Sequence, residues 1–371
     1  MKVATGLATG SDIDPNLAAQ AVGQAMRAAN ISIASSVLLF LTSEFARDPL
    51  LALRAAAKAA NCTQVMGCSA PGIFTDQDWV IDAPAAAAMV FADGLGLGVG
   101  VGSEADAGQW LLALAAPNAI NITWMSEPGK RFGGVSGDVT GQGPFSVWQN
   151  GKGTAPGHCE AVLLGVEGAV AATHGLKMLT APAVVAKSEG HDLQSLGGEP
   201  ALRTLHGACR QGKRAGQELP PLHRLMAVFA DSAEAIMQGN YQLAPLVSGN
   251  ESDHSVTLAK RVSQGQQLCW ALREADAAQA SLQQTAVKLS QQLPGKPEFG
   301  LLFSCLGRGP YFYGGVDHDL SLLRQQFPLM PFIGFYGNGE IAPVNGSSEL
   351  LQYSAVLGLF AQRSDKKARP G

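Results

Sequence analysis

Two stretches of this chain, residues 2–91 and 268–360, present strand-like and helix-like segments in the same order, and this repetition limits the fold more than any other feature. In both, short apolar runs alternate with longer segments whose apolar residues recur every three or four positions. The expected strands are residues 2–8, 37–41, 64–66 and 87–91 in the first stretch and 268–272, 299–305, 331–336 and 353–360 in the second. We therefore predict an α/β (α+β) fold, internally duplicated, with mixed β-sheets flanked by helices in two pseudo-equivalent halves.

Helix starts and small-residue loops also occur at matching places. Asp14-Pro15 and Asp48-Pro49 open the two expected helices of the first stretch, and Asp319 is the expected cap of a helix in the second. A loop of small residues follows the third strand of each stretch, at residues 67–72 and 337–343. Two glycine-containing loops in equivalent places favour duplication over chance.

The region between the two stretches is expected to be rich in strands. Strands are predicted at residues 120–124 and 145–148, and residues 161–166 are the expected partner strand after the tight turn at Asn150-Gly151. A helix is expected at residues 200–209, followed by a polar connection at 211–221. The predicted domains are residues 1–212, residues 213–362 and a flexible tail at residues 363–371.

Glycines alternate with apolar residues at positions 94–102, but their spacing does not satisfy the G-x-G-x-x-G pattern of dinucleotide-binding loops. This alternation favours a strand that another backbone approaches closely.

Composition excludes several classes of function. Apolar residues make up 46% of the chain and charged residues 15%, which is typical of a globular protein. The net charge of -4 gives no basic surface for nucleic acid. The six cysteines form no C-x-x-C pair, so neither a zinc site nor a disulfide framework is predicted. Without a signal-peptide core or an apolar run long enough to cross a bilayer, the expected location is the cytoplasm, with no membrane contact.

Five segments carry a resemblance to a known family. They read MGCS at 66–69, FGGVSGD at 132–138, THGLK at 173–177, LFSCLGRG at 302–309 and IGFYGNGEI at 333–341. In these segments the sequence resembles the FIST domain family, in both its N-terminal and its C-terminal domain. The resemblance implies a sensory module of signal transduction that binds small ligands such as amino acids. It also implies an alternative, because some bacterial relatives are haem proteins that sense nitric oxide and act on a partner histidine kinase.

The leading candidate site lies in the two loops of the second stretch. One carries Ser304, Cys305 and Arg308, and the other carries Tyr336, Asn338 and Glu340. Ligands of open α/β sheets bind beyond the carboxyl ends of the strands, where glycines let the backbone approach. We expect Arg308 to hold a ligand carboxylate with its planar guanidinium group and Glu340 to meet an ammonium group. The alternative is that Arg308 and Glu340 pair with each other.

Four further residues are candidates for the same cleft. Cys68 and Ser69 occupy the equivalent loop of the first stretch, where the alternative is a tight turn that requires small residues. Ser136 and Asp138 lie in the FGGVSGD segment, and the alternative for Asp138 is that it caps a turn.

Two other classes of function stay open. The primary prediction is that the protein has no cofactor. If haem does bind, His174 is the candidate axial ligand. An enzyme would use Cys68 or Cys305 as a thiol nucleophile with a histidine elsewhere, and a scaffold subunit would fill its own cleft with side chains. The resemblance therefore implies a sensory protein that binds a small molecule and signals through a separate partner, such as a histidine kinase.

Overall fold

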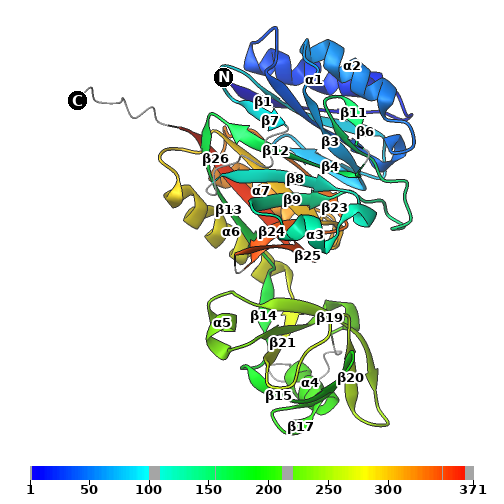
Figure 1. Cartoon of the computed structure of the whole chain (residues 1–371), viewed down its shortest axis with the longest axis vertical. Coiled ribbons are helices and arrows are strands. Elements are labelled where there is room, and N and C mark those ends of the chain that lie inside the picture. The colour runs from blue at the N-terminus through cyan, green and yellow to red at the C-terminus, as the bar shows by residue number, and fades with distance from the viewer. Residues whose placement is uncertain (1, 100–108, 155, 211–219, 345, 364–371) are drawn as a thin grey trace, which may run out of the picture. The chain divides into compact units, whose positions relative to one another are not determined.

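The computed structural model describes residues 2–99, 109–154, 156–210, 220–344 and 346–363 (Figure 1). The chain forms two compact units, one of residues 1–173 with 282–371 and one of residues 174–281. We call them unit 1 and unit 2. The expected domain boundary at 212–213 and residues 364–371 of the expected tail lie outside the described residues, as do positions 100 and 102 of the glycine alternation.

The described part of unit 1 contains three six-stranded sheets. In order across each sheet, the first consists of β1 (Val3–Thr9), β6 (Ala85–Phe91), β2 (Ser36–Thr42), β3 (Val65–Ala70), β10 (Val147–Gln149) and β11 (Lys152–Gly153). The second consists of β7 (Gly96–Val99), β12 (His158–Leu164), β8 (Trp110–Ala115), β9 (Lys130–Val135), β24 (Glu340–Val344) and β25 (Ser347–Leu351). The third consists of β13 (Val166–Thr173), β26 (Ala355–Gln362), β22 (Phe299–Cys305), β23 (Phe332–Gly337), β4 (Gly72–Thr75) and β5 (Trp79–Ile81).

The three sheets share one pattern of strand directions. In each, the two central strands are parallel (β2 with β3, β8 with β9, β22 with β23) and every other neighbouring pair is antiparallel. The hairpin that follows each second parallel strand joins a different sheet: β4–β5 enters the third, β10–β11 the first and β24–β25 the second. The predicted mixed-sheet fold is therefore confirmed, and the middle of the chain adds a third repeat of the same pattern.

Three glycines mark the same position in the three repeats. Gly67, Gly133 and Gly334 each lie in the second parallel strand, paired with Leu39, Ala113 and Leu302 respectively. A Cβ atom at any of these glycines would lie 1.7–1.8 Å from the carbonyl oxygen of that partner. Only glycine permits such a close approach of two strands, so these positions align the repeats residue by residue.

The inner faces of the three sheets share one hydrophobic core that contains Phe40, Phe132, Phe303 and Phe335. The outer faces differ in what covers them. The first packs on α1 (Asn16–Ala29) and α2 (Leu50–Ala60), seen together at the top of Figure 1, and the third packs on α6 (Ala275–Gln292) and α7 (His318–Gln326). On the second sheet, α3 (Ile122–Ser126) contributes Trp124 to a smaller cluster. None of the helices in the described part of the chain has both the length and the apolar character needed to cross a bilayer.

Unit 2 is an insertion in the third repeat, between β13 and β22. Its strands are β14 (Leu176–Met178), β15 (Ala183–Glu189), β16 (Asp192–Leu196), β17 (Glu199–Pro200), β18 (Leu225–Ala230), β19 (Gln242–Asn250), β20 (Ser255–Leu258) and β21 (Gln267–Arg273). These strands pair antiparallel and pack with α4 (Ala201–Arg210), which confirms the expected helix there, and α5 (Ala233–Met237) lies beside β18. The sequence placed residues 268–272 as the counterpart of residues 2–8, which is wrong, because β21 belongs to unit 2 and β13 takes that place in the third sheet.

Two predictions about the middle of the chain are also wrong. Residues 120–124 are not a strand, because the Asn121 side chain accepts a hydrogen bond from the Trp124 N–H (2.9 Å) and so caps the start of α3. Residues 161–166 do not partner residues 145–148. Instead β12 pairs with β7 and β8, while β10 forms a hairpin with β11 across Asn150-Gly151 and also pairs with β3.

Candidate functional site

The turns that follow the three second parallel strands meet inside unit 1. The Ser69 and Ser136 hydroxyl oxygens are 3.2 Å apart, and the Ser136 hydroxyl donates to the Ser69 carbonyl (2.6 Å). A Cβ atom at Gly137 would lie 2.4 Å from Asn338 Oδ1, and the Asn338 N–H donates to the Val135 carbonyl (3.1 Å). The expected convergence of the loops therefore occurs, but Ser69 and Ser136 are completely buried and fill their part of the space themselves.

A buried polar cluster lies at the carboxyl ends of β22 and β23, in the third repeat. Its centre is Arg308, which is 1% exposed and ends the 3-10 helix Leu306–Arg308 (η4). Arg308 Nε donates to Asp319 Oδ2 (2.9 Å), one terminal nitrogen donates to Asp319 Oδ1 (3.4 Å), and the other donates to the Thr173 carbonyl (2.7 Å). The carboxylate that Arg308 holds is thus Asp319, and not Glu340 as the sequence alternative proposed.

Asp317 and two tyrosines extend this cluster. Asp317 Oδ1 accepts the Leu320 N–H (2.9 Å) and so caps α7, the role that the sequence gave to Asp319. The Tyr336 hydroxyl donates to Asp317 Oδ2 (2.5 Å), and the Tyr313 hydroxyl donates to Asp319 Oδ1 (2.6 Å). Burial and the neighbouring Asp319 raise the pKa of Asp317 to about 6.

Glu340 carries a buried carboxyl group that is only partly hydrogen-bonded. It is completely buried, and one carboxyl oxygen, Oε2, accepts hydrogen bonds from the Ser354 N–H (3.3 Å) and hydroxyl (2.5 Å). Its other oxygen, Oε1, is buried without a hydrogen-bond partner among the described residues. Burial raises the pKa of Glu340 well above its usual value, although the hydrogen bonds from Ser354 and, to a smaller extent, the Arg308 charge oppose this rise.

A second unpartnered group lies close by along the third sheet. The Ser304 hydroxyl is buried, and within the described part of the chain it has no hydrogen-bond partner. Ser304 pairs across the sheet with Ala355, the residue after Ser354. Buried polar atoms without partners cost free energy unless something satisfies them.

The other two repeats show what these positions need for folding alone. In each sheet, one strand of the entering hairpin pairs with the residue that follows the aligned glycine. By this pairing Glu340 corresponds to Ile73 and Val147, which belong to the shared core. On the same alignment the remaining correspondences are Ser304 with Leu41 and Ala115, and Arg308 with the last residues of the other two 3-10 helices, Phe45 and Ala119. The third repeat therefore places charged or polar side chains where the others place mainly apolar ones, and folding does not require this.

Three other candidates from the sequence, Cys68, Cys305 and Asp138, lie in the core, at a strand end and in a turn. Cys68 is buried in the shared core, where burial raises the pKa of its thiol well above the usual value. Cys305 ends β22 and is 8% exposed. Asp138 accepts hydrogen bonds from the Thr140 hydroxyl (2.7 Å) and from the Gly141 N–H (2.5 Å), which is the turn-capping alternative.

His174, the candidate haem ligand, belongs to unit 2. Its ring lies half-buried against that of Tyr241, with ring centroids 5.6 Å apart. A haem bound through His174 would have to accommodate this tyrosine beside its axial ligand. In the described residues, no group of three or more His, Cys, Asp or Glu side chains is placed to hold a metal ion.

Sequence reasoning missed four members of the cluster. Tyr313, Asp317 and Ser354 were not considered, and Asp319 was assigned another role. The available signal was local, since an arginine followed nine and eleven residues later by aspartates places three charges next to one sheet edge. The pairing of Glu340 with Ser354 had no such signal, because it depends on how β24 crosses to the second sheet.

Comparison with known proteins finds two domain matches that together cover most of the chain. The FIST N domain matches residues 35–199 and the FIST C domain matches residues 201–343. An uncharacterized protein of Mycobacterium tuberculosis is 29% identical over 189 residues, 51% of this chain and 49% of the relative. An uncharacterized protein of Mycobacterium bovis is 28% identical over 200 residues, 53% of this chain and 52% of the relative. Human F-box only protein 22 is 42% identical over 52 residues, 13% of this chain and 12% of that protein. The chain thus spans about half the length of the mycobacterial relatives that it matches.

Proposed function

Because this chain belongs to the FIST family, we propose that it is a sensory protein that binds an amino acid in the buried polar cluster of the third repeat. FIST domains are associated with sensory signal transduction and small-ligand binding. The observation that carries the assignment to this cluster is Glu340, a buried carboxyl group with one unpartnered oxygen at a position where the other repeats have Ile73 and Val147.

The ammonium group of an amino acid suits Glu340. Burial raises the pKa of this carboxyl group well above its usual value, and an arriving cation would favour its ionised form. The resulting charge-assisted hydrogen bond to Oε1 would satisfy an atom that has no partner among the described residues. The Ser304 hydroxyl, on β22 of the third sheet, would add a second polar contact.

The ligand carboxylate would meet Arg308 in competition with Asp319. The Nε bond to Asp319 is short (2.9 Å), whereas the bond from the terminal nitrogen is long (3.4 Å), so the second is the one that a ligand would replace more easily. The segment from Gly309 to Val316 follows directly, and within it Tyr311 donates to Asp82 (2.6 Å). We propose that this segment moves when the ligand enters.

Arg308 also offers a route for the signal. Its hydrogen bond to the Thr173 carbonyl holds the last residue of unit 1 before the chain enters unit 2. A ligand that shifts Arg308 would change the hydrogen bonding at that connection, and so favour one state of the protein over another. Transmission to a separate protein such as a histidine kinase stays a prediction.

A thermal-shift screen of the twenty amino acids tests the proposal. One or a few of them should stabilise the protein, by about 2.7 kcal/mol when the ligand is at 100 times its Kd. Glu340→Gln should abolish the shift, while Glu167→Gln, at an exposed position on β13 of the third sheet, should leave it unchanged. The assignment is wrong if no amino acid shifts the melting temperature or if Glu340→Gln responds like the parent.

The same preparation separates the alternatives. A Soret band at near-equal haem and protein content would favour haem, with loss of the band in His174→Ala as its check. Selective alkylation of one unusually acidic thiol would favour an enzyme instead. The raised pKa of Cys68 supports a packing role for that residue.

A further inference from the structure

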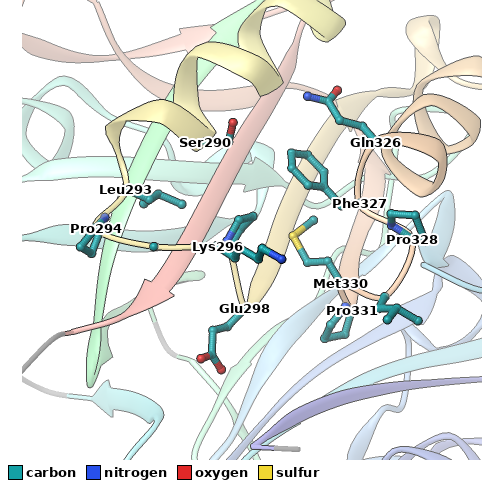
Figure 2. Close-up of a pocket in the computed structure, with 13 residues that line it drawn as sticks. Ser290, Leu293, Pro294, Lys296, Glu298, Gln326, Phe327, Pro328, Met330 and Pro331 are labelled. Carbon is teal, nitrogen blue, oxygen red and sulfur yellow. The ribbon is translucent and has the colours of Figure 1, made fainter.

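A groove with a volume of about 890 Å³ lies at the other end of the third sheet, where α6 and α7 end and β22 and β23 begin (Figure 2). One wall is the link from α6 to β22 and the other is the link from α7 to β23. Its apolar lining includes Leu293, Pro297, Phe327, Leu329 and Met330. The groove is separate from the polar cluster, which lies at the carboxyl ends of the same strands.

In the first repeat, hydrogen bonds join the corresponding links. There the Ala34 N–H donates to the Ala60 carbonyl (3.0 Å), and the Asn61 side chain donates to the Ser32 carbonyl (2.9 Å), so the two links are tied together. Counted back from the paired strands, Pro297 takes the place of Ala34, and proline has no N–H to donate. The groove is therefore built into the sequence of the third repeat.

The lining defines the chemistry of an occupant. Leu329 is 92% exposed at the rim, and prolines in both walls stiffen the groove, so little conformational entropy would be lost on binding. Figure 2 shows the Lys296 side chain extended across the groove while the Glu298 carboxylate points away from it. Lys296 has no ion pair with the described residues, and the buried oxygen of Gln326, Oε1, has no hydrogen-bond partner among them.

We propose that this groove binds a small apolar molecule that carries an anionic group and an N–H or O–H donor. The apolar body packs between Leu329, Phe327 and Met330, the anion lies at the Lys296 ammonium group, and the donor satisfies Gln326. Shape, apolar lining and a few polar groups that fix orientation are the usual features of small-molecule sites. This proposal does not depend on the amino-acid site.

The test uses the full chain and 1-anilinonaphthalene-8-sulfonate, an aromatic sulfonate with one N–H group, whose fluorescence rises on binding. We expect saturable binding of one molecule per chain, weakened about 3- to 10-fold by Lys296→Glu because an attraction becomes a repulsion. Leu329→Asp should weaken binding about tenfold, because it removes an apolar contact and adds a negative charge near the sulfonate. Octanoate, a carboxylate without aromatic rings or an N–H donor, should displace the probe.

Two matched controls lie on α6 outside the lining. Lys288→Glu changes the net charge as Lys296→Glu does, and Val287→Asp alters an exposed apolar residue as Leu329→Asp does. Both should bind the probe like the parent, and these two controls, Lys296→Glu and Leu329→Asp should all keep the parental melting temperature. Equal weakening by Lys296→Glu and Lys288→Glu, unsaturable binding, or no binding at all would overturn the proposal.

Discussion

Replacing Glu340 and Ser354 of the third repeat by the apolar residues found at the same positions of the first repeat tests whether Glu340 serves function and not folding. On the repeat alignment Glu340 corresponds to Ile73 and Ser354 to Ala85. In the first repeat the Ala85 N–H donates to the Thr42 hydroxyl (3.0 Å), and Cys305 takes the place of Thr42. The change is therefore Glu340→Ile with Ser354→Ala and Cys305→Thr, compared with Glu340→Ile alone.

The magnitude follows from the hydrogen bonds at Glu340. Removing a buried, unpartnered carboxyl oxygen should gain about 1–3 kcal/mol. Glu340→Ile alone also deprives the Ser354 N–H and hydroxyl of their acceptor, at about 1 kcal/mol each, so the single variant should be close to neutral. The triple variant provides a threonine acceptor, and should therefore be about 1–3 kcal/mol more stable than the parent. For a unit of this size that is a rise in Tm of about 2–12 °C.

The assays are calorimetry and urea unfolding, each between pH 4 and pH 8. Because the folded-state pKa of Glu340 is raised, the parent loses stability as pH rises from the unfolded value of 4.5 toward the folded value. The triple variant lacks this loss, so its advantage should grow over that range. The reasoning is refuted if the triple variant is less stable than the parent by 1 kcal/mol or more, or if its advantage does not change with pH.

Three further predictions concern other parts of unit 1. Asp317→Asn should remove a loss of stability between about pH 4 and pH 6 that amounts to about 3 kcal/mol in the parent, measured by urea unfolding, since the pKa of Asp317 is raised from 3.8 to about 6. Gly67→Ala should cost about 3 kcal/mol or more, because its Cβ would meet a backbone carbonyl, whereas Gly153→Ala, with open space around it, should cost less than about 1 kcal/mol by the same measurement. Native-state labelling with a thiol reagent, followed by mass spectrometry, should modify half-buried Cys62 well before buried Cys68, and equal rates would contradict the packing described here.

Much of the candidate site was within reach of the sequence. Ser304 lies near the end of the apolar strand β22, Arg308 comes shortly after that strand, and Glu340 comes shortly after β23. The carboxyl ends of these parallel strands lie at one sheet edge. The sequence did not reveal that Arg308 is already held by Asp319. Which of several nearby carboxylates an arginine meets depends on side-chain geometry, and no residue spacing encodes it.

The sequence by itself determined most of the elements, the mixed-sheet fold, most of the repetition between its first and last stretches, and the family. These properties depend on local periodicity, turn residues and short motifs, which are written in neighbouring positions. Only the tertiary structure decided that there are three repeats, because α3 of the second repeat is much shorter than its counterparts α2 and α7, and the third repeat is interrupted by unit 2. It also decided that each hairpin completes another repeat's sheet, since strand partners far apart in the chain are chosen by the packing of the whole core. That exchange places Glu340 in an apolar core beside Ser354, where the cost of an unpartnered carboxyl group first becomes visible.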